Sequence, residues 1–344
     1  MLGAGAWGTA LSIQLARRPG AAGVWLWARD PDQALSCASS RENARYLPGH
    51  RLPPGLRVTG DLEATLVEWD QAARRQPGGL LILATPVAGL EALSRVVAQQ
   101  LQQPPQGAGL LWLSKGVTQR ADGSFAWPSD LVGGALAAWP MGALSGPSFA
   151  QEVAQGLPVA LSLASNDMDW ARQAARTLHG GSMRVYATDD LVGVQLGGAI
   201  KNVLAIAAGV ADQLALGANA RAALITRGLA EAARLGAAMG AQAETFIGPS
   251  TLGDLVLTCT GDLSRNRRVG MALASGLGLR QSVASLGHVA EGVLTAPVIQ
   301  ALGAELDVEL PITEAVCAVL AGDLSAAEAL TRLLSREAAD ESSV

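Results

Sequence analysis

Gly3-Ala4-Gly5-Ala6-Trp7-Gly8 is the stretch of this 344-residue chain that decides the fold, because its three glycines have the spacing of a phosphate-binding turn. In such a turn the first glycine permits a tight bend and the second lets a pyrophosphate approach the backbone. The third lets the following helix pack closely on a strand. A helical pattern over residues 9–16 would then offer its N-terminal amides to phosphate. The stretch predicts a dinucleotide site that uses Gly3, Gly5 and Gly8, with a turn that binds no ligand as the alternative.

The residues after the next apolar run, 24–27, indicate which dinucleotide fits. An acidic residue about twenty positions after the glycines favours NAD, whereas an arginine there pairs with the 2′-phosphate of NADP. This chain has both, as Arg29-Asp30. Arg29 can take a 2′-phosphate, while Asp30 either faces away or binds the ribose. We expect NADPH to be accepted, and NADH stays an alternative.

Only Met1 and Leu2 precede the first glycine. The first strand of a doubly wound sheet is central and usually has about five residues. Either the strand is unusually short or the native chain begins upstream. We expect about five further apolar residues before Met1.

The two halves of the chain differ in their pattern of apolar residues. Short apolar runs that alternate with helical patterns predict a parallel, doubly wound sheet; they lie at 24–27, 80–83, 109–113, 142–144, 159–163 and 183–186. Helical patterns alone follow, at 194–214, 221–239, 269–277, 294–303, 312–320 and 325–334. We predict an α/β Rossmann-type domain at 1–187, an all-α substrate-binding domain at 188–338 and a flexible tail at 339–344.

Composition excludes several classes of protein. Hydrophobic residues make up 49% and charged residues 16%, which supplies a large core and argues against disorder. A net charge of −5 argues against a nucleic-acid partner. The apolar segment 196–216 contains Lys201 and Asp212, so we expect no membrane span.

The scattered cysteines and histidines argue against a disulfide framework and against a metal site. They are Cys37, Cys259, Cys317, His50, His179 and His288. Met1 is not followed by a basic and then apolar leader. These features together favour a cytoplasmic protein without a metal ion.

Lys115 and Lys201 are the only lysines among 25 basic residues, the rest being arginines. A lysine amine can shift its pKa and exchange a proton, whereas arginine stays charged. Lys115 follows an apolar run, where ligands bind in open α/β sheets. Lys201 has small and apolar neighbours, which would lower its pKa. The alternative is two solvated lysines, with Lys201 extending off a helix surface.

Two further segments have polar residues that suit a binding site. Ser264-Arg265-Asn266 precedes a helical pattern, so it is either a helix cap or a phosphate clamp. Glu291, in a predicted loop, is either a solvated charge or an acceptor for a ribose hydroxyl.

Eight segments stand out when the chain is taken as a whole: Gly3-Ala-Gly-Ala-Trp-Gly-Thr-Ala-Leu11, Tyr46-Leu-Pro-Gly49, Ser114-Lys-Gly116, Ser145-Gly-Pro-Ser-Phe-Ala150, Gly197-Gly-Ala-Ile-Lys-Asn202, Ala223-Leu-Ile-Thr-Arg-Gly228, Gly253-Asp254 and Ser264-Arg-Asn266. In this order they resemble the segments of the bacterial NAD(P)-dependent sn-glycerol-3-phosphate dehydrogenases, over nearly the whole chain. The resemblance implies reversible reduction of dihydroxyacetone phosphate to sn-glycerol 3-phosphate by NADP or NAD in reduced form. It also implies a role in glycerophospholipid synthesis. A homodimer is compatible with the sequence, which does not specify the oligomeric state.

The resemblance also implies roles for single residues. Lys201 is the proton donor and acceptor, and Lys115 contacts both substrate and cofactor. The further substrate positions are Gly146, Ser148, Asp254, Ser264, Arg265 and Asn266. The further cofactor positions are Ala6, Trp7, Arg29, Tyr46, Gly146, Ala150, Arg265, Val289 and Glu291, beside the three glycines of the turn.

Two rival functions remain at this stage. A β-hydroxyacid or 6-phosphogluconate-type dehydrogenase also pairs a Rossmann domain with helices and a catalytic lysine, but its carboxylate substrate would require further basic residues. A nicotinamide sensor would bind cofactor without turnover and would have no need of Lys115, Lys201, Asp254 and Arg265 together.

Overall fold

The computed structural model describes residues 1–18, 20, 23–120, 122–284 and 290–334, in two compact units. The first unit comprises Met1–Ser114 and Pro128–Leu191. The second comprises Lys115–Trp127 and the described residues from Val192 onward. We predicted two domains, each formed by one continuous stretch of the chain. Nothing in the sequence indicated that Lys115–Trp127 folds with the second unit. The predicted tail at 339–344 lies outside the described residues.

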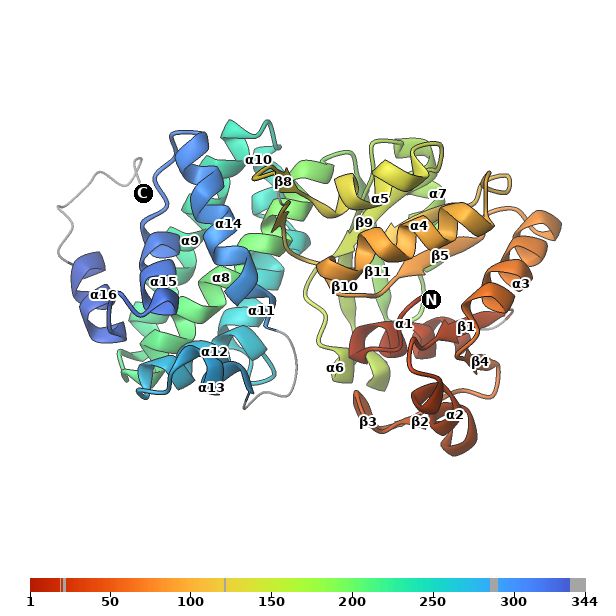
Figure 1. Cartoon of the computed structure of the whole chain (residues 1–344), viewed down its shortest axis with the longest axis horizontal. Helices are drawn as coiled ribbons and strands as arrows, with labels where there is room; N and C mark the ends of the chain where they lie inside the picture. Colours follow the sequence, from red (N-terminus) through yellow and green to blue (C-terminus); the bar gives the residue numbers. More distant parts are fainter. Residues whose placement is uncertain (19, 21–22, 121, 285–289, 335–344) are drawn as a thin grey trace. The chain divides into compact units, whose positions relative to one another are not determined.

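The first unit is built on one sheet (Figure 1). Strands β5 (Leu80–Leu83), β6 (Gly109–Trp112), β9 (Met141–Ser145), β10 (Val159–Ala164) and β11 (Met183–Thr188) pair in the order β11-β10-β9-β6-β5. Strand β1 (Val24–Trp27) pairs in parallel with β4 (Leu56–Thr59). Leu2 joins the two sets, because it bridges in parallel to Leu83 and to Trp27. All six predicted strands are confirmed, to within two residues at each end.

The pairing of β9 with β10 differs from the parallel sheet that we predicted. These two strands are antiparallel, with Ser145 opposite Ser162, while β10 and β11 are again parallel. The connection between them contains one short helix, α6 (Ala150–Gln155), which packs on helix α1 (Ala6–Ala16).

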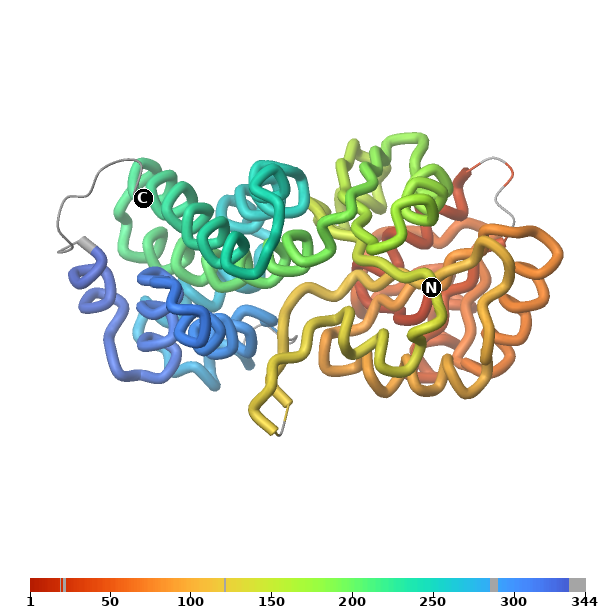
Figure 2. The backbone as a smooth tube through the Cα atoms, turned by 90° about the horizontal axis from the view of Figure 1, so that it is seen from above, coloured from red at the N-terminus to blue at the C-terminus, as the bar shows by residue number. Residues whose placement is uncertain are grey.

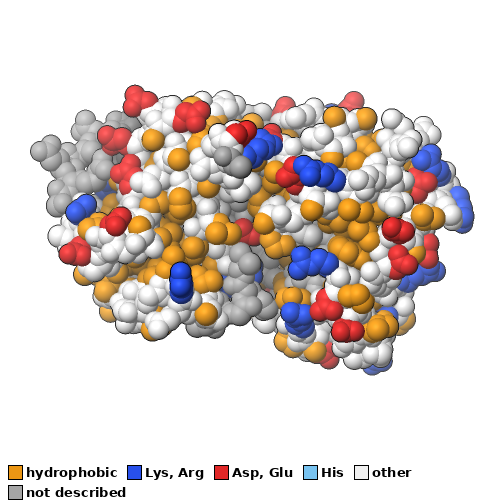
Figure 3. Space-filling view, in the orientation of Figure 1, with side chains coloured by type: hydrophobic (Ala, Val, Ile, Leu, Met, Phe, Trp, Pro, Cys, Tyr) orange, Lys and Arg blue, Asp and Glu red, His pale blue; other side chains and the backbone are white. Residues whose placement is uncertain are grey.

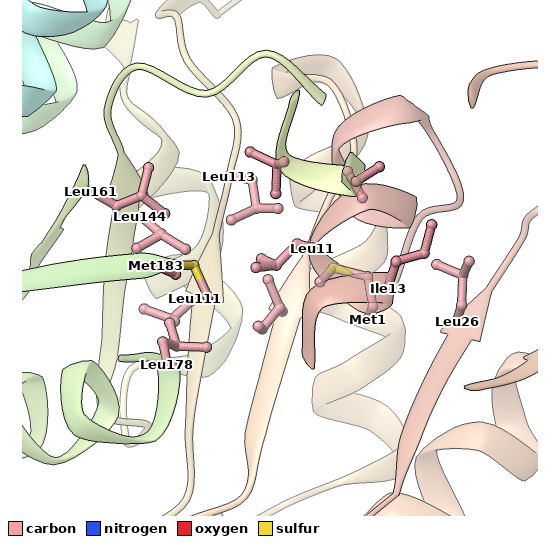
Figure 4. Close-up of a cluster of buried hydrophobic side chains, with 14 of the residues drawn as sticks. Met1, Leu11, Ile13, Leu26, Leu111, Leu113, Leu144, Leu161, Leu178 and Met183 are labelled. Carbon is pink, nitrogen blue, oxygen red and sulfur yellow. The ribbon is translucent and has the colours of Figure 1, made fainter. Parts of the chain in front are cut away.

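Helices cover both faces of this sheet (Figures 1 and 2). Helices α1, α6 and α7 (Met168–Leu178) lie on one face, and α3 (Leu62–Arg75), α4 (Leu90–Gln100) and α5 (Pro128–Leu136) on the other. Figure 4 shows Leu11 of α1 on the side of Leu111 and Leu144 of the strands and Ile13 beside Leu26 of β1, all in one buried cluster. Burial on both faces explains why the strands are continuous apolar runs.

The second unit is helical, with helix α8 (Leu191–Gln213) at its core. The other elements are the hairpin β7 (Thr118–Gln119) and β8 (Phe125–Ala126), helices α9 (Gly217–Ala238), α10 (Ala243–Phe246), the π-helical turn η2 (Pro249–Gly253), α11 (Asp254–Thr260), α12 (Arg265–Ala274), α13 (Leu279–Ala284), α14 (Glu291–Glu305), α15 (Pro311–Ala321) and α16 (Ala326–Leu334). The six predicted helices are confirmed, whereas α10, η2, α11 and α13 were not predicted.

Helix α8 is long and apolar enough to cross a bilayer, but its surroundings are those of a core helix. Of its most apolar 18-residue window, 94% is buried inside the protein. Its backbone touches that of α12, because a Cβ on Gly209 would overlap the Arg267 carbonyl oxygen and a Cβ on Gly270 the Ile206 carbonyl oxygen. Glycines at both positions hold the two helices in direct contact.

Charged side chains of both signs are interspersed on the face of the molecule that Figure 3 shows. On the face in Figure 3, the visible basic groups lie singly or beside acidic ones and form no continuous basic area. Exposed pairs such as Arg45–Asp30 and Arg57–Glu68 are of this kind. That face has no basic stripe of the sort that nucleic-acid-binding proteins present.

Candidate active site

The glycine turn has the geometry that its spacing predicts. Gly3 has a φ of +128°, and a Cβ there would lie 2.6 Å from the Ala84 carbonyl oxygen. A Cβ on Gly8 would overlap the Gly3 carbonyl oxygen, whereas a Cβ on Gly5 would meet nothing within 4 Å. Gly5 precedes α1, and among the described residues no side chain caps this helix. The open position and the uncapped amides of Ala6 and Trp7 fit a pyrophosphate group.

Two polar side chains that we did not predict form hydrogen bonds to the backbone of this turn. The Ala4 carbonyl oxygen accepts hydrogen bonds from Gln33 Nε2 at 2.8 Å and from Asn43 Nδ2 at 2.9 Å. Asn43 is fully buried and also donates to the Thr9 hydroxyl at 2.8 Å. The sole hint in the sequence was a polar residue shortly before the Tyr46-Leu-Pro-Gly49 segment.

Arg29 and Asp30 have different surroundings at the end of β1. Arg29 is exposed. Asp30 caps helix α2 (Pro31–Ser40), accepting from the amides of Asp32 at 3.0 Å and Gln33 at 3.4 Å. Its other oxygen is 3.0 Å from the Arg45 guanidinium, which lies 5.2 Å above the half-buried Tyr46 ring. Of the two alternatives for Asp30, these contacts favour the one in which it does not bind the ribose.

Gly146, Ser148 and Ala150 follow the carboxyl end of β9, on the sheet edge where ligands bind in α/β folds. Gly146 has a φ of +145°, and a Cβ there would lie 2.7 Å from the Ala160 carbonyl oxygen. The Ser148 hydroxyl donates to the Gly146 carbonyl oxygen at 3.0 Å, and Ala150 begins α6. The segment is a bent connection that only glycine permits at its first position.

In the second unit, two helices and one loop bring Lys115, Lys201 and Asp254 together. Lys201, on α8, is 8% exposed and donates to Asp254 Oδ1 at 2.8 Å and to the Thr258 hydroxyl at 2.9 Å. Lys115 donates to Asp254 Oδ2 at 2.5 Å. Asp254 begins α11, and Thr258 lies one turn later on the same face. Two ammonium groups therefore share one buried carboxylate.

The electrostatics of this cluster follow from its burial. Burial lowers the pKa of Lys201 to about 8; the Asp254 carboxylate opposes this shift and the Lys115 ammonium adds to it. Burial by itself would raise the pKa of Asp254, but the two lysines outweigh it and hold that pKa below its ordinary value. Lys201 can thus lose and regain a proton near neutral pH while Asp254 stays ionised.

A chain of amides links this cluster to α12 and α14. Asn266 Nδ2 donates to Asn202 Oδ1 at 2.9 Å, and Asn266 Oδ1 accepts from the Gly292 amide at 3.0 Å. Asn202 Nδ2 donates to the carbonyl oxygens of Gly198 at 3.3 Å and Lys115 at 3.5 Å. The Asn266 side chain therefore bridges protein groups.

The remaining predicted residues lie at helix starts in the same unit. The Ser264 hydroxyl accepts from the Arg267 amide at 3.3 Å, so this serine is a helix cap. Arg265 is the first residue of α12 and is exposed; the Glu291 carboxylate, at the start of α14, acts on it electrostatically. Val289 lies outside the described residues.

Around Lys201, Thr258 and Asn202 are further residues that we did not predict. Asn202 stood in the quoted Gly197–Asn202 segment, next to Lys201. Thr258 could have been found from its spacing of four residues from Asp254, once that segment was known to be helical.

Both halves of the sequence match one family of proteins. Residues 1–171 match the family described as NAD-dependent glycerol-3-phosphate dehydrogenase N-terminus, and residues 190–331 match its C-terminus. The glycerol-3-phosphate dehydrogenase (NAD(P)+) of Dechloromonas aromatica is 51% identical over 342 residues, with 99% of this chain and 98% of the relative covered. The protein of the same name from Methylibium petroleiphilum is 52% identical, with coverage of 99% and 97%.

A solved structure agrees with the sequence relatives. The crystal structure of glycerol-3-phosphate dehydrogenase from Coxiella burnetii is 38% identical to this chain and superposes with a TM-score of 0.87. The match covers 97% of this chain and 98% of that one.

Proposed function

This chain belongs to the NAD-dependent glycerol-3-phosphate dehydrogenase family, and from that premise we propose that it reversibly reduces dihydroxyacetone phosphate to sn-glycerol 3-phosphate with NADPH or NADH. The observation that carries the proposal is the buried Asp254 carboxylate shared by Lys115 and Lys201. It provides an ionisable proton donor and a second positive charge in a family that reduces a ketone.

Lys201 is the proton donor in this proposal. When bound, the reduced nicotinamide supplies a hydride to the ketone carbon of the substrate. Negative charge then grows on the ketone oxygen, which the Lys201 ammonium stabilises and protonates. A general acid in this position contributes ~10²–10⁴-fold to the rate. A pKa of about 8 suits the task, because the amine can also take the proton back in the oxidation direction.

Lys115 and Asp254 prepare Lys201 for this step. Lys115 holds a second positive charge on the same carboxylate and would polarise the ketone oxygen. Asp254 keeps Lys201 oriented and raises its pKa against the effect of burial. Without the carboxylate, Lys201 would lose its proton at lower pH, and less of it would be in the ammonium form near neutral pH.

The start of α12 is the proposed phosphate site. Arg265 is exposed there and can form paired hydrogen bonds to phosphate, and the first-turn amides of the helix add donors. Asn266 contributes through its backbone amide, because its side chain bridges Asn202 and Gly292. Asn266 therefore stays a predicted substrate position, with its backbone amide as the proposed contact.

The first unit supplies the proposed dinucleotide site. The pyrophosphate lies on the glycine turn and the α1 amides, Arg29 pairs with the 2′-phosphate, and Tyr46 lies near the nucleotide. The remaining proposed contacts are Gly146, Ser148 and Ala150 in this unit, and Val289 and Glu291 from the second unit. Ser148 lies at the substrate, while Gly146 meets both molecules.

We further propose that the product supplies glycerophospholipid synthesis in the cytoplasm, and that the chain acts as a homodimer. The first part follows from the product, which is the phosphorylated glycerol unit of such lipids. Size-exclusion chromatography with light scattering tests the second part.

The deciding experiment runs in both directions on the purified chain. NADPH oxidation is followed with dihydroxyacetone phosphate and with β-keto acids, and NADP+ reduction is followed with sn-glycerol 3-phosphate, β-hydroxyacids and 6-phosphogluconate. We expect turnover with dihydroxyacetone phosphate and sn-glycerol 3-phosphate alone. Turnover only with the carboxylates would identify the hydroxyacid dehydrogenase instead. Cofactor binding without turnover on any of them would identify a nicotinamide sensor.

A further inference from the structure

The turn that contains Arg45 is linked by hydrogen bonds to the glycine turn. Asn43 holds the Ala4 carbonyl oxygen and the Thr9 hydroxyl through its Nδ2 atom. Its Oδ1 atom accepts from the Tyr46 amide at 3.4 Å. Arg45 lies between Asn43 and Tyr46, so its backbone is held in place relative to the predicted pyrophosphate site.

Arg45 also neutralises the acidic residue that stands where NAD-specific sites have theirs. Asp30 uses Oδ1 to cap α2 and Oδ2 to bind Arg45 at 3.0 Å. A carboxylate at the end of this strand, if unpaired, would accept ribose hydroxyls and repel a 2′-phosphate. With both oxygens engaged and the Arg45 guanidinium against one of them, Asp30 is a weaker acceptor for ribose hydroxyls and repels a 2′-phosphate less.

The surroundings of Arg45 suit anion binding better than a structural role. Exposed ion pairs contribute little to stability, and the Arg45 and Asp30 side chains are 60% and 45% exposed. The guanidinium lies 5.2 Å above the Tyr46 ring, which limits its motion while leaving its outer donors in solvent. Arg29, also exposed, precedes Asp30 directly.

We propose that Arg45 is a specificity-determining residue, which neutralises Asp30 and, together with Arg29, binds the 2′-phosphate of NADPH. The inference rests on the proposed function for the identity of the cofactor. It explains how a chain with an acidic residue at this position accepts a phosphorylated ribose.

The test is a titration of NADPH and NADH fluorescence on the full chain at low ionic strength, with the Arg45→Gln variant. We expect the NADPH dissociation constant to rise at least ~10-fold, as for loss of one charge-assisted contact to phosphate, and the NADH constant to change by less than about threefold. Equal changes for the two cofactors would overturn the inference.

Arg57→Gln is the matched control. Arg57 pairs with Glu68 at 3.4 Å and lies 5.6 Å above the Trp25 ring, with 68% of its side chain exposed. It stands at the second position of β4, away from the carboxyl end of the strand. If this variant weakens NADPH binding as much as Arg45→Gln does, the loss of affinity comes from general surface charge and the proposal is wrong.

The double variant Asp30→Asn/Arg45→Gln tests the neutralisation. Asparagine caps a helix as well as aspartate does, so α2 keeps its cap. The double variant should bind NADPH more tightly than Arg45→Gln, because the unpaired carboxylate is gone. The same NADPH affinity in both variants would contradict the proposal.

Turnover separates this inference from the proposed function. If the cofactor affinities change as expected but neither the wild type nor any variant reduces dihydroxyacetone phosphate, the function is wrong and the role of Arg45 stands. If Arg45→Gln reduces the substrate with an unchanged NADPH-to-NADH ratio of kcat/KM, the role of Arg45 is wrong and the function stands.

Discussion

Lys201 and Lys115 have the same charge and the same partner, but their contacts differ. Lys201 makes two side-chain hydrogen bonds, to Asp254 and Thr258, in a site that lowers its pKa. In the structure, Lys115 donates to the other oxygen of Asp254, and its side chain is 16% exposed. Replacing each lysine by arginine therefore separates proton transfer from charge.

For Lys201→Arg we expect turnover to fall at least ~100-fold with NADPH binding near normal, because a guanidinium does not release a proton near neutral pH. Lys115→Arg is the comparison, and we expect mainly a raised KM for dihydroxyacetone phosphate. Steady-state kinetics and cofactor titration decide the matter. Wild-type turnover in Lys201→Arg would refute the acid–base role.

The pKa of Lys201 sets the pH dependence of both directions of the reaction. Reduction needs the ammonium form, so kcat/KM for dihydroxyacetone phosphate should fall as pH rises through about 8. Oxidation of sn-glycerol 3-phosphate needs the neutral amine and should rise over the same range. Because Asp254 raises this pKa, Asp254→Asn should move both midpoints to lower pH.

Asp262→Asn is the control for that shift. Asp262 pairs with Arg267 and its side chain is 95% exposed. We expect its pH profile to match that of the wild type. A midpoint that stays near 8 in Asp254→Asn would show that Lys201 is not the group that titrates.

At the scale of elements, the contact between α8 and the π-helical turn η2 determines whether Lys201 and Asp254 meet. A Cβ on Gly197 would overlap the Thr251 hydroxyl oxygen. Gly197 lies one turn before Lys201 on α8, and Thr251 lies in η2, three residues before Asp254. A side chain at Gly197 would push apart the two elements that hold the ion pair.

We expect Gly197→Ala to cost about 1–3 kcal/mol in the free energy of unfolding, as overpacking does, and to lower kcat. Gly134→Ala is the matched helical control, because Gly134 is exposed in α5 and a Cβ there meets nothing within 4 Å. It should be neutral or stabilising by about 0.5–1 kcal/mol. Denaturant unfolding and kinetics measure both variants; if the two behave alike, η2 does not depend on this contact.

At the scale of the whole molecule, Glu231 couples stability to pH. It is 1% exposed on α9 and accepts from the amides of Ile312 at 2.6 Å and Thr313 at 3.3 Å, at the start of α15. Burial raises the pKa of Glu231 from 4.5 to about 7, although these hydrogen bonds oppose the shift. The unfolded chain therefore loses this proton at lower pH than the folded chain does.

With a raised folded-state pKa, the contribution of Glu231 to stability is complete below pH 4.5 and is lost as pH rises through about 7. The loss is on the order of 3 kcal/mol. Glu231→Gln should show a shallower fall in the free energy of unfolding over this range. Glu314→Gln, at an exposed position of α15, should keep the wild-type slope. Identical slopes in both variants would exclude Glu231 as the titrating group.

The sequence by itself determined the features that depend on local spacing. The glycine turn, the six apolar strands and the six long helices each need only a few consecutive residues, because backbone sterics and periodic burial act within one element. The two lysines stood out by composition alone. The candidate role of Arg29 in cofactor binding was predicted from its distance to the glycines along the chain.

Only the tertiary structure decided which side chains meet. Lys115 reaches Asp254 because Lys115–Trp127 folds with the helical unit, and Asp30 is neutralised because a later turn brings Arg45 to it. The antiparallel pairing of β10 with β9 and the hydrogen bond from Asn266 to Asn202 were likewise decided by the tertiary structure. Hydrogen bonds and ion pairs between residues far apart in the chain depend on how elements pack, and no local pattern specifies that packing.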